Sequence, residues 1–442
     1  MNRIKFKNHC LTLVTLIVTS IITAQTDTEK ASETVSKSEI EGHIYFLADD
    51  ALKGRATGSP ELKIAASYLA NTFRSYGVKP NPASGDYYQK VEMFRFYLNE
   101  KINLSLNGVS FPEVVAFDID AINSEEDAIY LNYGLKNDYE GKDVKDKIII
   151  VKAGTPDALE LRPALGSRAQ KRELAIKNGA KGLIEIGAFE DAIWPRFKHA
   201  FEERVSLTEG EKEPLPLYVW VQTSQEELDK LGAETLKIKI KSNGIQKAII
   251  QSQNVVGVLE GTDSKLKNEY VIYSAHYDHI GIGKPDAKGD SIYNGARDNA
   301  IGTTAVLTMA ENLAKYPTKR SALFILFTGE EMGLLGSQYY VQHPVLPLEQ
   351  MIYCFNTDGG GYNNTSLATI AGLNRTTAKD KMIEGAKTFG LKALDIDEVA
   401  PEEGLFDRSD NVSFAKIGIP APTYSTGFDA FDDEINKYYH QA

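Results

Sequence analysis

Residues 269–302 read EYVIYSAHYDHIGIGKPDAKGDSIYNGARDNAIG, and this stretch decides the fold. Its first part, Tyr270 to Ala275, is a short apolar and β-branched run, which predicts a buried strand. His276 and Asp278 follow at the carboxyl end of that strand. A polar, Gly-rich loop then leads to Asp298, after which apolar residues recur at helical spacing. The stretch therefore predicts a strand, a loop rich in metal-binding side chains, and a helix.

Two further strands are predicted to end in the same way. Ala322 to Phe327 is a continuous apolar run followed by Glu330 and Glu331, and Met351 to Phe355 is followed by Asp358. Buried parallel strands read as such runs, and the ligand of an open α/β sheet binds outside their carboxyl ends. The sequence therefore predicts an α/β fold, a three-layer α/β/α arrangement with a mostly parallel sheet, whose carboxyl edge gathers these side chains.

The first 24 residues have the features of a secretory signal peptide. Arg3, Lys5 and Lys7 form a basic region, and Leu11 to Ala24 is apolar. About fourteen apolar residues are too few to span a bilayer, so we expect a cleavable signal rather than a membrane anchor. The mature protein is therefore expected to be secreted or periplasmic.

The composition is that of a globular protein of two domains. The chain has 442 residues, of which 42% are hydrophobic and 25% are charged. Its formal net charge is −12, which becomes −15 once the three cations of the signal peptide are removed. Such an acidic protein lacks the basic patches that bind nucleic acid or anionic membranes. Cys10 is lost with the signal peptide, so Cys354 is left as a single packed thiol and no disulfide is predicted.

The rest of the chain divides into a main domain and an insertion. Residues 25–37 are polar and are predicted to be a disordered linker. Residues 38–100 begin with two helices expected to cover the main sheet, which resumes in residues 251–442. Between them, residues 101–250 hold short alternating runs and one βα unit, which predict an inserted β-rich module.

The side chains at the strand ends match the needs of a two-metal site. Such a site needs a bridging carboxylate, and one imidazole and one further acid for each ion. The candidates are His276 and His440 as imidazoles, Asp298 as the bridge, and Asp358 and Glu331 as the further acids. Mixed nitrogen and oxygen ligands favour zinc over calcium or magnesium, with cobalt or manganese as alternatives. We therefore expect two zinc ions per chain.

Neighbouring residues are expected to serve this site in different ways. Consecutive side chains of an extended chain point in opposite directions, so we assign Glu330 as general base and Glu331 as metal ligand. Asp278 is expected to accept the ring N–H of His276 and so to fix its tautomer. The other histidines lack such a context and are interpreted as structural or surface residues: His43, His199, His279 and His343.

At these residues the sequence resembles the M28 family of zinc aminopeptidases. The matching segments are SAHYDHIG (274–281), NGARDNAIG (294–302), FTGEEMGLLGS (327–337), FNTDGGG (355–361) and NKYYH (436–440). The resemblance implies that His276 and Asp358 bind one zinc, that Glu331 and His440 bind the other, and that Asp298 bridges them. It also implies Glu330 as the base, Asp278 behind His276, and Tyr439 as the residue that steadies the tetrahedral intermediate.

The insertion is similar to a protease-associated (PA) domain, through VKDKIIIVKAG (144–154) and KRELAIKNGAKGLIEIG (171–187). Such a domain beside the cleft either limits substrate access or serves as a passive spacer. The chain departs from many M28 relatives at Arg297, where they have an acid, and at Asn411, where they have a histidine. Relatives continue past the position of His440, so we expect the sequence to be truncated after Ala442.

The sequence thus predicts a secreted metal-dependent aminopeptidase that removes N-terminal residues from peptides, through a water activated by two zinc ions. One alternative on the same site is a carboxypeptidase like the glutamate carboxypeptidases, or a dipeptidase, for which Arg408 and Arg297 are the candidate carboxylate anchors. Glutaminyl cyclisation on one zinc is a further alternative, although the complete two-metal set and the PA-like insertion disfavour it. A metal-free binding ectodomain would lack ligands, and none is missing.

Overall fold

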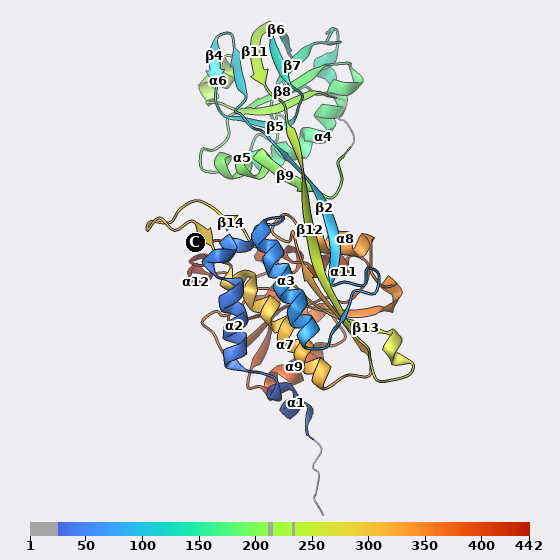
Figure 1. Ribbon diagram of the computed structural model, residues 1–442. Helices are drawn as coiled ribbons and strands as arrows, with labels where there is room; N and C mark the ends of the chain where they lie inside the picture. Colours follow the sequence, from blue (N-terminus) through green and yellow to red (C-terminus); the bar gives the residue numbers. More distant parts are fainter. Residues whose placement is uncertain (1–24, 211–214, 232–234) are drawn as a thin grey trace, which may run out of the picture.

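The computed structural model describes residues 25–210, 215–231 and 235–442. The chain forms two modules, each built on its own large sheet. Figure 1 shows the smaller module at the top, joined to the larger one by two long strands, β2 (Tyr88–Tyr97) and β12 (Gln246–Leu259). Among the described residues, no helix is long and apolar enough to cross a bilayer. The signal peptide predicted for residues 1–24 lies outside the described residues.

The larger module is built on a mixed sheet with the strand order β19, β18, β20, β17, β13, β16, β12, β2, β9, and with β1 paired to β12. The strands not yet located are β19 (Lys392–Asp395), β18 (Leu367–Ala371), β20 (Thr423–Thr426), β17 (Met351–Thr357), β13 (Tyr270–His276), β16 (Ser321–Phe327), β9 (Glu203–Ser206) and β1 (Lys79–Pro80). β13 is parallel to both β16 and β17, whereas β12 is antiparallel to both β16 and β2. Beyond β17, β20 is parallel to β17 and β18 is parallel to β19, but β18 is antiparallel to β20. The sheet is therefore mixed, and the prediction of a mostly parallel sheet is wrong. Because β2 leads to the smaller module and β12 returns from it, these two strands are antiparallel.

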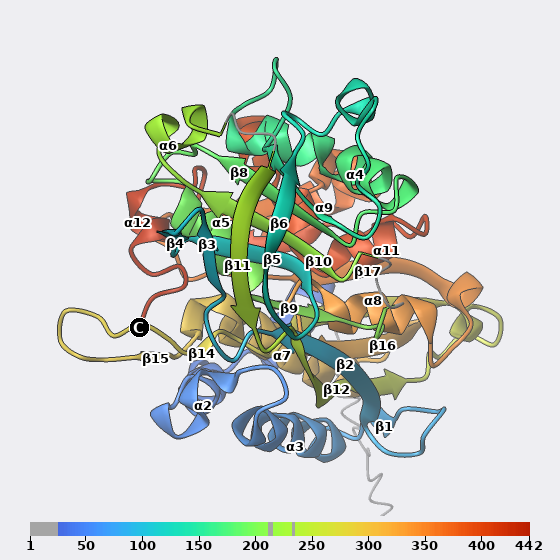
Figure 2. The same ribbon diagram turned by 90° about the horizontal axis from the view of Figure 1, so that it is seen from above.

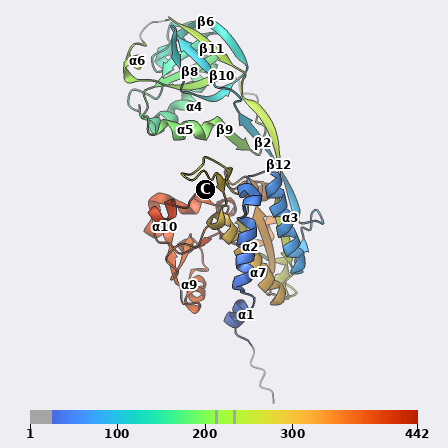
Figure 3. The same ribbon diagram turned by 60° about the vertical axis from the view of Figure 1, so that its left-hand side comes forward.

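Helices cover both faces of this sheet, because residues of its buried strands alternate between two cores. In β16, Phe324 and Leu326 belong to one core, and Leu323 and Ile325 belong to the other. The first core is covered by α2 (Lys37–Leu47), α3 (Pro60–Ser75) and α7 (Ile301–Lys315), and the second by α8 (Leu335–Gln342) and α11 (Asn411–Ala415). Figure 3 shows α2, α7 and α3 along one face of the sheet, and α9 (Lys379–Thr388) and α10 (Ile396–Val399) on the far side of the module. The predicted three layers are present.

The segment before α2 is ordered, so the prediction of a disordered linker over residues 25–37 is wrong. Residues Asp27–Glu33 form α1, which is closed by a capping box between Thr26 and Glu29. Asn312 of α7 donates to the Lys30 carbonyl and to the Thr34 hydroxyl, both at 2.8 Å. The polar composition does not predict this helix, because the helix is held in place by contacts with Asn312, which is distant in sequence.

The smaller module is built on a second sheet with the strand order β4, β3, β11, β6, β7, β8, β10, β5. Its strands are β4 (Val109–Phe111), β3 (Asn103–Leu106), β11 (Thr235–Ser242), β6 (Ile122–Tyr130), β7 (Ile148–Lys152), β8 (Gly182–Gly187), β10 (Leu217–Gln222) and β5 (Val114–Ile119), and its helices are α4 (Leu161–Lys177), α5 (Trp194–Glu202) and α6 (Gln225–Asp229). The predicted βα unit is α4 followed by β8. The sheet packs on two apolar cores of its own.

The insertion also contributes to the larger sheet, because β9 lies within the inserted residues and pairs with β2. β12 begins at Gln246, so the larger sheet starts a few residues before the predicted boundary at residue 251. Figure 2 looks down on the smaller module, which lies over the larger one. Figures 1 and 3 place the C-terminus on the side of the larger module that faces the smaller one.

Candidate metal site

Three neighbouring strands deliver the predicted side chains to one edge of the larger sheet. His276 is the last residue of β13, Glu330 and Glu331 follow β16, and Asp358 follows β17. Their strands are paired in the order β17, β13, β16. Asp298 lies in the irregular turn Ala296–Ala300 that leads into α7, and His440 follows α12 (Asp433–Asn436). Residues far apart in sequence therefore meet at the carboxyl ends of these strands, as the sequence predicts.

The first group of potential ligands contains His276, Asp298 and Asp358. His276 Nε2 lies 3.2 Å from Asp298 Oδ1 and 3.3 Å from Asp358 Oδ1. The loops that carry the two acids are tied together by Asn299, which donates to the Thr357 carbonyl and accepts from the Gly359 amide. One imidazole and two carboxylates face one another here, which is a donor set suited to zinc.

The second group contains His279, Asp298, Glu331 and His440. His440 Nε2 lies 3.3 Å from Asp298 Oδ2 and 3.2 Å from Glu331 Oε2, and among the described residues this buried nitrogen has no partner in hydrogen-bond geometry. Asp298 therefore belongs to both groups, with one carboxylate oxygen toward each imidazole. The orphaned nitrogen and the mixed donors fit a metal ion at each position, bridged by Asp298.

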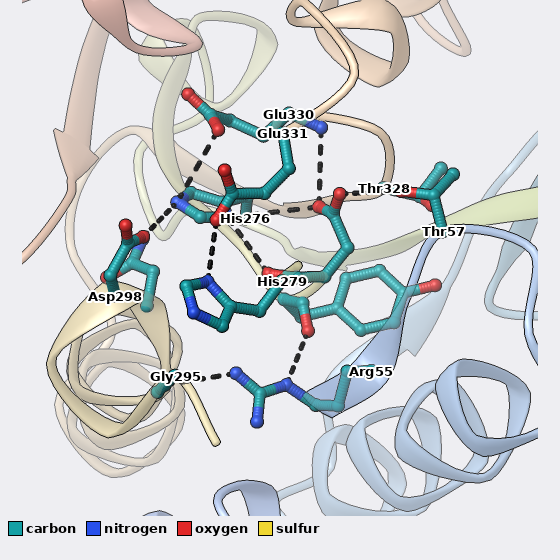
Figure 4. Close-up of polar contacts among 12 residues, drawn as sticks. Arg55, Thr57, His276, His279, Gly295, Asp298, Thr328, Glu330 and Glu331 are labelled. Atoms are coloured by element: carbon teal, nitrogen blue, oxygen red, sulfur yellow. Dashed lines mark hydrogen bonds and ion pairs between the residues drawn. The ribbon is translucent and has the colours of Figure 1, made fainter. Parts of the chain in front are cut away.

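His279 corrects the interpretation that this histidine is merely structural or a surface residue. Its side chain is 2% exposed, and its Nδ1 lies 2.6 Å from Glu331 Oε1 (Figure 4). Gly295 permits this approach, because a Cβ there would lie 2.6 Å from the ring of His279. The sequence places His279 directly after Asp278 in the same loop, which is the one feature that could have suggested it. The alternation of side chains along the chain did not predict that its ring faces the site.

Asp278 lies behind His276, but its carboxylate has other partners than predicted. His276 Nδ1 is 3.2 Å from the Asp278 carbonyl and 3.8 Å from the carboxylate. That carboxylate accepts from the Thr57 hydroxyl at 2.7 Å and from the Glu330 amide at 3.3 Å. The main chain of Asp278 thus orients the imidazole, while its side chain orients the start of the Glu330 loop.

Glu330 belongs to neither ligand group, but its carboxylate lies near His276. Its Oε2 lies 4.0 Å from His276 Nε2, and its side chain is 10% exposed. Burial raises the pKa of Glu330 well above its usual value. A carboxylate with a raised pKa beside a metal position has the properties of a general base.

The imidazoles are held in their charged form by the acids around them. Burial disfavours the imidazolium of His276, but Glu330 and Asp358 outweigh burial and raise the pKa of His276 well above its usual value. Burial likewise opposes the shift at His440, yet close contacts with the carboxylates of Asp298 and Glu331 raise the pKa of His440 to about 9. The same contacts hold the pKa of Asp298 well below its usual value in spite of burial. A metal ion would take the place of these protons.

A cavity of about 100 Å³ opens beside the metal positions. Its polar lining includes Asp298, Glu330, Glu331, Asp358, Arg408 and Tyr439. Its apolar lining includes Ala371, Ile396, Leu405, Phe428, Phe431 and Ile435. The cavity therefore combines reactive groups with apolar surface that can contact an apolar side chain.

The aromatic and cationic residues around the cavity are already engaged. Tyr439 stacks on His440 with ring centroids 3.9 Å apart, and its hydroxyl accepts from Arg408 at 3.3 Å. Arg408 also lies 3.5 Å from Glu403. Arg297 lies 3.5 Å from Glu434 and packs over the Tyr438 ring at 4.2 Å, so it contacts the segment that carries His440.

Asn411, His43 and His343 lie outside both ligand groups. Asn411 is buried and donates to the carbonyls of Phe406 and Ala421. His43 is buried and bonds two tyrosine hydroxyls, and His343 is exposed. Cys354 is a buried free thiol, as predicted. The structure does not describe the side chain of His199.

Comparisons with known proteins agree with this geometry. Residues 254–442 match the model of Peptidase family M28. Aminopeptidase YwaD of Bacillus subtilis is 25% identical over 97% of this chain and 87% of its own, and a probable leucine aminopeptidase 2 of Aspergillus oryzae is 22% identical over 88% of this chain and 76% of its own. A solved aminopeptidase from Aneurinibacillus sp. strain AM-1 shares the fold with a TM-score of 0.58 and 21% identity, covering 90% of this chain and 86% of its own.

Both ligand groups lie entirely within the matched residues 254–442. The protein is therefore an enzyme, a metallo-exopeptidase that uses zinc. More particularly, residues 254–442 of its larger module are similar to the peptidases of family M28.

Proposed function

We propose that the protein is an aminopeptidase that hydrolyses N-terminal residues from peptides at a site holding two zinc ions. The observation that carries this proposal is the position of Asp298, whose two oxygens face the imidazoles of His276 and His440. Asp358 would complete the first position, and Glu331 the second. His279 would hold Glu331 in place, or add a ligand to the second position.

The chain's own residues would divide the work of hydrolysis. When bound, the zinc ions would activate a water molecule and polarise the peptide carbonyl. Glu330 is placed to take a proton from the attacking water and to pass it to the leaving amine. Burial raises the pKa of Tyr439 to about 12, so its hydroxyl keeps its proton and is available to donate to the developing oxyanion.

The cavity supports a substrate whose N-terminal side chain is apolar. Its lining includes apolar side chains such as Ile396, Leu405 and Phe428. The acids that also line the cavity, among them Asp358, are suited to hold a free α-amine. A buried apolar side chain contributes free energy in proportion to its area, so large apolar residues should be preferred.

Two observations favour an aminopeptidase over a carboxypeptidase. Each candidate carboxylate anchor already has an acidic neighbour at 3.5 Å, Glu403 for Arg408 and Glu434 for Arg297. The curated relatives that match most of this chain are named aminopeptidases. Paired assays on leucine anilide and on an N-acetylated peptide with a free carboxylate, with and without a zinc chelator, test the proposal. We expect only the anilide to be cleaved, and only without chelator; cleavage of the blocked peptide would favour the carboxypeptidase.

The proposal also gives a role to the smaller module and to the predicted signal peptide. The module lies over the edge of the larger one that carries the C-terminus, a position from which a PA-like domain would limit the size of substrates. Secretion rests on the signal peptide predicted for residues 1–24, and it stays a prediction. Comparing cleavage rates for a dipeptide and a folded protein with an accessible N-terminus tests whether the smaller module limits substrate size.

A further inference from the structure

His440 is carried by a segment at the surface of the larger module. This α12 segment, residues 433–440, consists of α12 and the residues that follow it, and Figure 1 shows α12 close to the C-terminus. Of these residues, all of which the structure describes, Ile435 alone is buried. The side chain of His440 is 33% exposed, whereas that of His276, which ends a central strand, is 1% exposed. The position of His440 therefore depends on what holds the α12 segment in place.

Arg297 makes two contacts with the α12 segment. It directly precedes Asp298 in the sequence, and its side chain is 29% exposed. Its guanidinium carbon lies over the ring of Tyr438, 4.2 Å from the centroid, and its Nη1 lies 3.5 Å from Glu434 Oε1. A guanidinium is attracted both by the face of an aromatic ring and by a carboxylate. One side chain thus ties the turn that carries Asp298 to the segment that carries His440.

The same side chain also contacts the segment that follows Asp358. The guanidinium carbon of Arg297 lies 5.1 Å from the centroid of the Tyr362 ring, which is within the range of a cation–π contact. Tyr362 follows Asp358 after a run of glycines and is 9% exposed. The side chain passes close to that run, because a Cβ at Gly361 would lie 3.9 Å from Arg297 Cγ. Arg297 therefore joins three segments, and each of them carries a candidate ligand.

We propose that Arg297 is a positioning residue that holds the α12 segment so that His440 reaches the second metal position. Zinc–nitrogen bonds are about 2.0–2.1 Å long, and a metal site tolerates deviations of only about 0.2 Å. A surface segment must therefore be held closely for His440 to share an ion with Asp298. Arg408 gives the same segment a further contact, because it donates to the Tyr439 hydroxyl at 3.3 Å. Loss of Arg297 should thus loosen the segment without releasing it. The proposal rests on the metal site proposed above.

Hydrogen–deuterium exchange in the metal-free protein measures how firmly the α12 segment is held. Arg297→Met keeps an unbranched side chain but removes the charge and the planar group. We expect the amides of residues 433–440 to exchange about tenfold faster in this variant, as for the loss of a cation–π contact at a partly exposed site. The control is Arg320→Met, which removes an ion pair of 2.6 Å with Glu269 at the other end of β16 from Glu330. Exchange that is unchanged in Arg297→Met, or raised equally in the control, would overturn the proposal.

Zinc retention tests whether this contact matters for the second ion. Arg297→Met should weaken one of the two zinc ions by about 10 to 100-fold, the range typical of groups that support a ligand, and should leave the other ion in place. Arg297→Lys keeps the charge but not the stacking, so its loss should be smaller. Tyr438→Leu removes the same contact from its other partner, so adding it to Arg297→Met should cost less than the sum of the two single losses. Fully additive losses, or a second ion bound as in the unmodified protein, would overturn the proposal.

The two measurements separate failure of this proposal from failure of the proposed function. If the unmodified protein binds no zinc, the metal site itself is wrong, and exchange in the metal-free protein still decides whether Arg297 holds the α12 segment. If the unmodified protein binds two ions but leaves leucine anilide intact, the aminopeptidase assignment is wrong, and the zinc retention of Arg297→Met still decides the role of Arg297.

Discussion

Glu330 and Glu331 are adjacent in sequence, yet their carboxylates lie beside the imidazoles of two different histidines, His276 and His440. Glu330 Oε2 is 4.0 Å from His276 Nε2, whereas Glu331 Oε2 is 3.2 Å from His440 Nε2. Glu331 also contacts His279 at 2.6 Å. The chain turns through Gly329 at φ +68 just before this pair, in a region that favours glycine. One short turn thus supplies a base candidate and a ligand candidate with separate surroundings.

Exchanging each glutamate for glutamine separates these two roles. Glu330→Gln removes the proton acceptor and leaves both ligand groups intact. We expect kcat on leucine anilide to fall by about 10² to 10⁴-fold, the range typical of general acid–base catalysis. Zinc content, measured by elemental analysis after gel filtration, should stay at two ions per chain.

Glu331→Gln is the matched control, because it changes the neighbouring residue by the same atoms. It should lower the zinc content toward one ion per chain, and activity should recover partly in excess zinc. If Glu330→Gln retained activity, or if it lost zinc as Glu331→Gln does, Glu330 would not be the base.

The second prediction concerns His279, because its ring contacts Glu331, a candidate metal ligand. His279→Ala removes the hydrogen bond to Glu331 Oε1. Loss of such a supporting group typically costs about 10 to 100-fold in metal affinity. We expect one of the two zinc ions to be lost at a chelator concentration that the unmodified protein tolerates.

The exposed His343 gives the control, since His343→Ala removes the same ring far from the ligand groups. Its zinc retention should equal that of the unmodified protein. Unchanged zinc retention in His279→Ala would mean that Glu331 is held adequately without this contact.

Much of this site follows from short patterns in the sequence. The apolar runs that became β13, β16 and β17 are each followed by polar residues, and parallel strands bring those ends together. Ligand chemistry then selects His276, Asp298 and Asp358 from among the polar residues. Local pattern and the rule for parallel strands suffice for these residues.

The residues that escaped prediction depend on contacts between distant segments. Arg55 adopts φ +51 and bonds the Tyr277 carbonyl, which is 222 residues away. The order of α1 depends on Asn312, whose bond to the Lys30 carbonyl spans 282 residues. Periodicity carries no information about such contacts, so the sequence pattern alone does not predict them.

Zinc binding should strengthen as the pH rises. In the metal-free protein, close contacts with the carboxylates of Asp298 and Glu331 outweigh burial and raise the pKa of His440 to about 9. At neutral pH this imidazole therefore carries a proton that must leave before its nitrogen can bind metal. Between pH 6.5 and the pKa of His440, each displaced proton should raise the apparent zinc affinity by about tenfold per pH unit.

Titration calorimetry in buffers of different ionisation enthalpy counts the protons released on zinc binding. We expect at least about one proton per chain at pH 7, and fewer above the pKa of His440. His440→Asn removes this group, so it should release fewer protons at pH 7. A zinc affinity that does not change over this range would contradict a protonated His440 in the metal-free protein.

A larger side chain in the apolar lining of the cavity should change which substrates are cleaved. Ala371 lies at the end of β18, is 6% exposed, and lines the cavity with Ile396 and Leu405. Ala371→Leu adds three carbon atoms to a space of about 100 Å³, so a large substrate side chain would no longer fit. A difference of one methylene in an apolar pocket changes kcat/KM by about 10 to 200-fold. We therefore expect kcat/KM for leucine anilide to fall by at least about tenfold, and kcat/KM for alanine anilide to change little. Equal losses on both substrates would place the substrate side chain elsewhere, whereas unchanged zinc content would exclude damage to the metal site as the cause.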